Sequence, residues 1–278
     1  MVENCLAYAE KAGNQGKPIV GIMCEYTPRE LIMAAGAVPA CLCGGSAKMI
    51  PAAEEHLPSN LCPLIKSTYG YMVSKANPFL EQARLIVAET TCDGKKKMYE
   101  LMAEEKPLHI LELPQKPDEP GALQTWTREI AGLRDRLEQT FDVAITEKKL
   151  RESISLMNRE RALRRRCAGF MESENPPLSG RELLELKSII SGIPEDIDEY
   201  ERLAEQFAAD GEIDRSGRTR VLVTGVPHAH GAEHVIDLIE NRGGLVVCME
   251  NCTGVKPILE DVDENAEDPL EAVARDRK

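Results

Sequence analysis

The sequence predicts an α/β protein with two parallel-sheet units joined by a helical connector. Continuous apolar runs of strand length are typical of buried parallel strands, and here such runs are followed by helical segments. They occur at residues 18–23, 85–88, 221–223 and 245–249. Between the first and second pairs of runs, residues 145–215 are helical in pattern almost throughout. The fold class is therefore α/β, with helices separating two sheets.

This pattern divides the chain into three segments. The first α/β unit covers residues 1–145, the helical connector covers 146–216, and the second α/β unit begins within 217–278. Only two strands are predicted in the second unit, and a parallel sheet of two strands leaves its faces and edges exposed. We therefore expect the second unit to be incomplete within this sequence.

Local signals predict where individual helices lie. Thr27, Pro28 and Glu30 form a capping-box pattern, which predicts a helix starting at Pro28 with Thr27 as its N-cap. Residues 122–141 carry apolar side chains at helical spacing, and Trp126 belongs to that apolar stripe. A longer helix is predicted over 147–171, and its basic end, Arg159 to Arg166, is interpreted as a solvated face.

Composition and charge exclude several classes of protein. The net charge of −13 argues against a general nucleic-acid binder, which needs a basic surface. No apolar run approaches the roughly 20 residues that span a bilayer, and the N-terminus lacks a signal pattern. We therefore expect a cytoplasmic protein with no nucleic-acid or membrane partner. The phosphate-binding pattern G-x-x-x-x-G-K-[ST] is absent, so no nucleotide site is predicted.

Four of the nine cysteines share one kind of position. Cys24 and Cys252 follow apolar strands, Cys92 lies between a strand and a helix, and Cys62 opens a helix before Pro63. The carboxyl ends of parallel strands are where ligands bind, and a helix N-terminus lowers the pKa of a thiol. None of the four lies in a C-x-x-C zinc pattern. Dispersed cysteines of this kind suit an iron–sulfur cluster, whereas buried structural cysteines and a cysteine nucleophile are the alternatives.

Other candidate residues are interpreted more simply. Cys41 and Cys43 form a C-x-C pair on a predicted strand, and packing is the favoured role. His228 and His230 lie two residues apart in a loop, where a solvated position is favoured over a ligand role. Cys167 has no motif around it. No catalytic residue is identified.

At its cysteine motifs the sequence resembles the 2-hydroxyacyl-CoA dehydratase D-component family, which includes benzoyl-CoA reductase subunits and double-cubane cluster proteins. The motifs at 61–66 and 91–97, Leu-Cys-Pro-Leu-Ile-Lys and Thr-Cys-Asp-Gly-Lys-Lys-Lys, are the most specific. Similarity extends along nearly the whole chain, with matching stretches at 24–36, 60–66, 89–100 and 250–254. The double-cubane subgroup is the nearest, because Cys24 and Cys252 accompany Cys62 and Cys92.

The resemblance implies two Rossmann-like, flavodoxin-like lobes joined by helices, usually in a homodimer or with a related subunit. It implies an iron–sulfur cofactor, either a 4Fe–4S cluster or a double cubane, with Cys24, Cys62, Cys92 and Cys252 as metal ligands. Electrons would come from a separate ATP-hydrolysing 4Fe–4S activator, so that ATP binds only to that partner. The implied function is ATP-dependent reduction of a small substrate at low potential.

The sequence departs from the family pattern in its second lobe, which stops after two strands and lacks further ligand cysteines. This predicts either a fragment or a chain completed by a second polypeptide. Two other functions remain open: a 2-hydroxyacyl-CoA dehydratase subunit, which is a lyase component, and a cluster-free scaffold without enzymatic activity. Whether the chain is itself an enzyme therefore remains open at this point.

Overall fold

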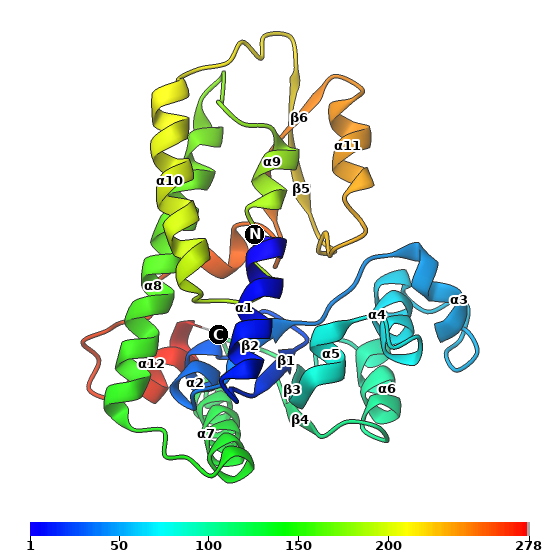
Figure 1. Ribbon diagram of the computed structural model, residues 1–278, viewed down its shortest axis with the longest axis vertical. Helices are drawn as coiled ribbons and strands as arrows, with labels where there is room; N and C mark the ends of the chain where they lie inside the picture. The colour runs from blue at the N-terminus through cyan, green and yellow to red at the C-terminus, as the bar shows by residue number, and fades with distance from the viewer. Residues whose placement is uncertain (277–278) are drawn as a thin grey trace.

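Two parallel sheets form the framework of the protein, which is described here from a computed structural model covering residues 1–276 (Figure 1). The first sheet has the order β2-β1-β3-β4, and the second consists of β5 and β6. All of these neighbours pair in parallel, which confirms the predicted α/β class. The strands are β1 (Ile19–Ile22), β2 (Val38–Cys41), β3 (Ala83–Glu89), β4 (Leu108–Leu111), β5 (Thr219–Thr224) and β6 (Gly244–Glu250).

Helices cover both faces of the first sheet. Successive side chains on β3 alternate between two apolar cores, with Ile86 and Ala88 in one and Leu85 and Val87 in the other. The first core contains α1 (Val2–Asn14), α3 (Ile50–Ala53), α4 (Pro63–Val73), α5 (Pro78–Gln82) and α6 (Asp93–Met102). The second contains α2 (Arg29–Ala34), α7 (Ala122–Phe141), α8 (Glu147–Gly169) and α12 (Pro269–Asp276). Trp126 is buried in the second core, as predicted.

The long helix α8 runs from the first sheet toward the second (Figure 1). It packs against α2 and against α10 (Pro194–Asp210), and the role of this region as a connector stays a prediction. The domain boundaries at 145 and 216 stay a prediction. The last described helix, α12, packs back on the first sheet beside α7 and α8.

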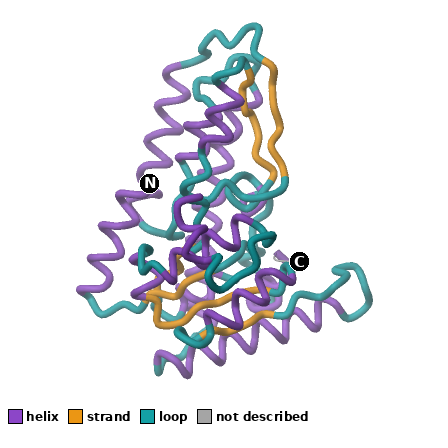
Figure 2. Tube along the Cα trace, turned by 90° about the vertical axis from the view of Figure 1, so that its right-hand side faces the viewer, coloured by secondary structure: helices purple, strands orange, loops and turns teal. Residues whose placement is uncertain are grey.

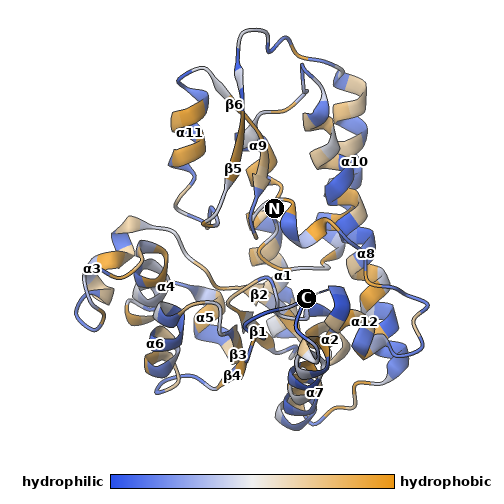
Figure 3. Cartoon of the chain, turned by 180° about the vertical axis from the view of Figure 1, so that it is seen from behind, coloured by the Kyte–Doolittle hydropathy of each residue, from blue (hydrophilic) through white to orange (hydrophobic). Residues whose placement is uncertain are grey.

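The second sheet has two strands, compared with four in the first. Figure 2 shows the two groups of strands well apart. The second sheet packs against α9 (Gly180–Glu185) and α11 (His234–Glu240) through Val246, Met249 and Ile236. Leu222 on β5 and Leu238 on α11 are 59% and 61% exposed. Figure 3 shows α11 as a largely apolar helix at the edge of the molecule. Three short 3-10 helices complete the described elements: η1 (Ala47–Met49), η2 (Phe170–Glu172) and η3 (Lys256–Ile258).

The predicted capping box at α2 is wrong. The helix begins at Arg29, and no side chain caps its N-terminus. The Thr27 hydroxyl donates instead to the Glu89 carboxylate, and the Glu30 carboxylate accepts a hydrogen bond from Arg161. Thr27 and Glu30 are both fully buried. Their side chains bond to residues distant in sequence and therefore do not form the capping box.

The interpretation of the basic end of α8 as a solvated face is wrong for Arg161. Its guanidinium is 1% exposed and donates to Asn158 at 2.7 Å as well as to Glu30. Arg159, two residues earlier, does fit the prediction, because its pair with Glu201 is largely exposed. Among residues 1–276, no helix has the length and apolarity needed to span a membrane.

Candidate functional site at the facing sheet edges

The four predicted cysteines lie at the ends of secondary-structure elements, as the sequence indicated. Cys24 follows β1, and Cys252 follows β6. Cys62 is the N-cap residue of α4, and Cys92 is the N-cap residue of α6, directly beyond β3. The structure thus reproduces the predicted local setting of each cysteine.

Backbone contacts join the edges of the two sheets near these cysteines. Gly45, beyond the end of β2, donates its N–H to the His230 carbonyl beyond β5 at 2.8 Å. Gly231 adopts a φ of +99°, and a Cβ there would lie 2.8 Å from the Ser46 Cα. Glycine is therefore needed both for the backbone conformation and for the close approach. The carboxyl ends of β2 and β5 consequently meet at one junction between the sheets.

Cys62 and Cys92 form one side of the site. The Cys92 Sγ accepts a hydrogen bond from the Lys95 backbone N–H at 3.4 Å, at the N-terminus of α6. The segment that carries Cys62 packs against this turn at Gly94. A Cβ on Gly94 would lie 2.8 Å from the Ile65 Cδ1 and 3.0 Å from the Leu61 Cδ1. Both cysteines are exposed.

Cys43 lies beside the residue that precedes Cys24, and Cys252 follows β6 in the second sheet. Burial raises the pKa of Cys24 to about 12, and the charge of the Glu89 carboxylate adds to that rise. Burial likewise raises the pKa of Cys252 to about 11. The Cys43 thiol donates to the Met23 carbonyl at 3.2 Å, directly before Cys24. Cys24 and Cys43 therefore lie close together beyond the ends of β1 and β2.

Cys43 is a site residue that the sequence interpretation missed. Packing was favoured for both members of the C-x-C pair, and it holds for Cys41, which contacts the second apolar core. Cys43 lies beyond the end of β2, as Cys24 lies beyond the end of β1. The position of Cys43 directly after a predicted strand was the sequence signal that could have indicated a site residue.

The candidate site also contains a buried acid, Glu89. Glu89 is the last residue of β3 and is fully buried. Burial raises the pKa of its carboxyl to about 7, against the opposing effects of the Thr27 hydrogen bond and of Lys95. Its Oε2 and the Tyr99 hydroxyl have no hydrogen-bond partner within the described chain. Burial also raises the pKa of Tyr99, and the charge of Glu89 adds to that effect.

The Cys252 loop is held by its own polar side chains. The Asn251 Oδ1 accepts hydrogen bonds from the Thr253 N–H at 3.0 Å and the Gly254 N–H at 3.1 Å. The His228 N–H donates to the Thr253 hydroxyl at 3.1 Å, and the His228 ring is buried beside Asn251. The solvated position expected for His228 is therefore wrong, because this residue packs on the Cys252 loop.

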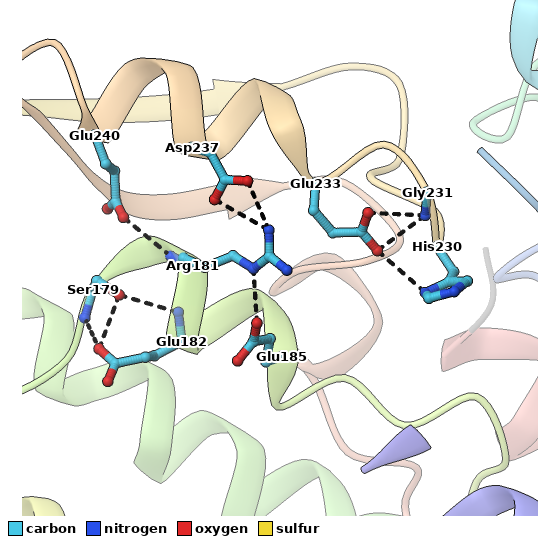
Figure 4. Close-up of polar contacts among 9 residues, drawn as sticks. All are labelled: Ser179, Arg181, Glu182, Glu185, His230, Gly231, Glu233, Asp237 and Glu240. Carbon is cyan, nitrogen blue, oxygen red and sulfur yellow. Dashed lines mark hydrogen bonds and ion pairs between the residues drawn. The ribbon is translucent and has the colours of Figure 1, made fainter. Parts of the chain in front are cut away.

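His230 fits the solvated interpretation better, and it belongs to a surface network between α9 and α11 (Figure 4). Its side chain is 69% exposed, and its Nδ1 lies 3.2 Å from the Glu233 Oε1. Within the same network Arg181 donates to Asp237 at 2.9 Å and to Glu185 at 2.8 Å. The Arg181–Asp237 pair joins α9 to α11, whereas the His230–Glu233 pair joins the preceding loop to the start of α11.

The donor chemistry of this region is that of free cysteine thiols, the ligand type of iron–sulfur clusters. Within residues 1–276, no three His, Cys, Asp or Glu side chains are placed to hold a single metal ion. Iron–sulfur clusters are held by thiolates, and the cysteines here come from separate element ends along both sides of the junction. The unpartnered buried oxygens of Glu89 and Tyr99 lie in the same region.

Fold and site together define an α/β protein with cysteine thiols at facing edges of two parallel sheets. A family model described as 2-hydroxyglutaryl-CoA dehydratase, D-component, matches residues 24–277. The chain belongs to this family, as the sequence motifs predicted.

Three relatives illustrate the range of the family. The chain is 41% identical to the Escherichia coli putative dehydratase subunit YjiM over 87% of its own length and 64% of that protein. It is 24% identical to a benzoyl-CoA reductase subunit of Thauera aromatica, over 85% of its own length and 62% of that protein. It is 27% identical to the beta subunit of lactoyl-CoA dehydratase of Anaerotignum propionicum, over 54% and 39% respectively. The chain thus spans less than two thirds of the length of these relatives.

Proposed function

We propose that this chain is an iron–sulfur component that passes electrons of low potential to a small substrate. The observation that carries the proposal is the junction of the two sheets, where Cys24 and Cys43 lie beyond the ends of β1 and β2 and Cys252 lies beyond the end of β6. Family membership supports it, because the relatives include a benzoyl-CoA reductase subunit and a lactoyl-CoA dehydratase subunit.

Cys24, Cys62, Cys92 and Cys252 are the proposed ligands. The Lys95 backbone N–H donates to the Cys92 Sγ, and the close packing at Gly94 keeps Cys62 on the same side of the site. Asn251 holds the loop that presents Cys252. When bound, a thiolate-ligated 4Fe–4S cluster or double cubane supplies one-electron transfer at low potential.

The energy source is proposed to lie on a partner protein. No phosphate-binding pattern is present in the sequence, so ATP hydrolysis is assigned to a separate 4Fe–4S activator that docks and delivers the electron. A homodimer, or a dimer with a related subunit, in the cytoplasm is part of the same proposal.

A second candidate function is that of a 2-hydroxyacyl-CoA dehydratase subunit. The specific observation in its favour is the 41% identity to a protein named as a dehydratase subunit, which exceeds the 24% identity to the benzoyl-CoA reductase subunit. In that role the electron would enter a thioester carbonyl of the substrate. Two assays of the anaerobic protein with its activator distinguish the functions. Dehydration of a 2-hydroxyacyl-CoA indicates the dehydratase subunit, and net consumption of electrons indicates the reductase.

Iron and sulfide analysis of the anaerobically reconstituted chain tests the common part of both functions. We expect iron and sulfide in a ratio typical of a cubane, with the ratio of iron to protein separating one cubane from two. Cys92→Ala should lower the iron content, whereas Cys167→Ala should not, because Cys167 is buried on α8 and donates to the Tyr200 carbonyl at 3.7 Å. Absence of iron from the wild-type chain would instead support a cluster-free scaffold.

A further inference from the structure

The three consecutive lysines after Cys92 do not share one environment. The Lys96 ammonium pairs with Asp93 at 3.1 Å, and the Lys97 ammonium pairs with Glu100; all four of these side chains are well exposed. The Lys95 side chain turns inward instead, and its Nζ donates to the Met23 carbonyl at 3.1 Å. A solvated helix start therefore describes two of the three lysines but not Lys95.

Lys95 connects two of the proposed ligand positions. Its backbone N–H donates to the Cys92 Sγ at 3.4 Å, and its ammonium reaches the carbonyl directly before Cys24. The Cys43 thiol donates to the same carbonyl at 3.2 Å. One residue thus links the start of α6 to the end of β1 and lies beside a third thiol.

The Lys95 ammonium and the Cys43 thiol meet at the Met23 carbonyl, directly before Cys24. Burial lowers the pKa of the Lys95 ammonium, but nearby acidic groups raise it above its ordinary value, so the side chain stays protonated. These groups are Cys43, Cys24, Glu89 and Cys252. In the opposite direction, Lys95 lowers the pKa of Cys24 and of Cys43 against the larger effect of their burial.

We infer that Lys95 is the positioning residue of the thiol site, and that its ammonium supplies the positive charge that offsets bound thiolates and an added electron. This inference rests on the proposed iron–sulfur function. A fixed positive charge beside a redox centre of low local dielectric stabilises the reduced state more than the oxidised state. Removing that charge should therefore make the centre harder to reduce, beyond any effect on folding.

The test compares Lys95→Met with Lys97→Met in the full chain after anaerobic reconstitution. Both variants remove one lysine from the same run, but only Lys95 faces the thiols. Iron content is measured by chemical analysis, and the reduction potential is measured by a redox titration followed by electron paramagnetic resonance. For Lys97→Met we expect wild-type values in both measurements.

For Lys95→Met we expect less iron per chain. We also expect the equilibrium constant for one-electron reduction to fall at least tenfold, which corresponds to a shift of about 59 mV to more negative potential. Lys95→Arg keeps the positive charge and should restore the potential to within about threefold in that constant, even if its iron content stays lower. Circular dichroism before reconstitution checks that each variant is folded.

The possible results separate this inference from the function on which it rests. If the wild type holds iron and Lys95→Met matches Lys97→Met in iron content and potential, the inference is wrong and the proposed function stands. If the wild type holds no iron, the proposed function fails and the inference fails with it. If Lys95→Met folds but holds no iron, recovery of iron in Lys95→Arg supports the role of the charge, and no recovery overturns it.

Discussion

The two parallel sheets follow the same strand-then-helix pattern, but they are buried to very different degrees. Every residue of β1 is buried, and on β3 only Arg84 is exposed. On β5 the side chains alternate between exposed and half-buried positions beyond its first residue. The first sheet has helices on both faces, whereas Leu222 and Leu238 remain more than half exposed in the second.

This difference shows how stability and site geometry are divided within the chain. Apolar burial and buried ion pairs stabilise the first sheet and its contact with α8. This part of the chain carries Cys24, Cys62 and Cys92. The second sheet has a smaller core, and the helices beside it carry surface ion pairs such as those of Arg181. It contributes Cys252. The site is therefore built from one firmly packed edge and one less buried edge.

The largest effect is expected from Arg161→Met, at the contact of α8 with α2. Removing the guanidinium leaves the Glu30 carboxylate buried without this partner, which costs about 3–5 kcal/mol of unfolding free energy. Urea unfolding measures the loss. Arg159→Met on the same helix is the control and should cost about 0–1 kcal/mol, because its pair with Glu201 is exposed. Equal losses in both variants would contradict the contribution assigned to the buried pair.

A second comparison tests the two sheets directly. Leu85→Ala, in the fully buried centre of β3, should lower the unfolding free energy by about 2–5 kcal/mol through lost burial and a cavity. Leu222→Ala, on a side chain that is 59% exposed, should change it by less than about 0.5 kcal/mol. Thermal and urea unfolding of both variants provide the measurement. A large loss in Leu222→Ala would mean that β5 is covered in solution.

Glu89→Gln is expected to alter the pH dependence of stability in the metal-free protein. The pKa of Glu89 is about 7 in the folded chain and about 4.5 as its ordinary value, so the stability it contributes is present below 4.5 and is lost as the pH rises toward 7. Glutamine removes that loss and still accepts the hydrogen bond from Thr27. Relative to wild type, the variant should therefore gain about 1–3 kcal/mol between pH 4.5 and pH 8. A parallel pH profile for the two proteins would show that Glu89 ionises normally.

The smallest effect is expected from Arg181→Ala in the second sheet. Its ion pairs with Asp237 and Glu185 are part of the surface network of Figure 4, and exposed pairs contribute about 0–1 kcal/mol each. Global unfolding should change little, while amide hydrogen exchange in α11 should become faster. Unchanged exchange in α11 would mean that the apolar contacts of Ile236 alone hold this helix.

Much of the architecture was predictable because its signals are local. The stripe of residues 122–141 is the helix α7, and its Trp126 lies in the core. Strand runs at 18–23 and 85–88 became β1 and β3, and each proposed cysteine ligand lies at the predicted element end. These features depend on periodicity and on neighbours a few residues away, which a single sequence contains.

The errors and omissions all involve partners that are distant in sequence. Thr27 donates to Glu89 across 62 residues, and Arg161 donates to Glu30 across 131, so neither takes the local role that its neighbours favoured. His228 is buried against the Cys252 loop, and Lys95 reaches across 72 residues to Met23. Nothing in the neighbouring residues distinguishes Lys95 from Lys96 and Lys97.

Residue chemistry and spacing were sufficient for the α/β class, the family, and the position of Cys24, Cys62, Cys92 and Cys252 at element ends. They follow from apolar periodicity, turn residues and short motifs, which act within a few residues. The position of Cys43 beside Cys24, and the choice of Lys95 as the inward lysine, depend on how separate segments pack near the junction of the sheets. Charge and burial at that junction are properties of the packed chain, because each is set by side chains from several separate segments.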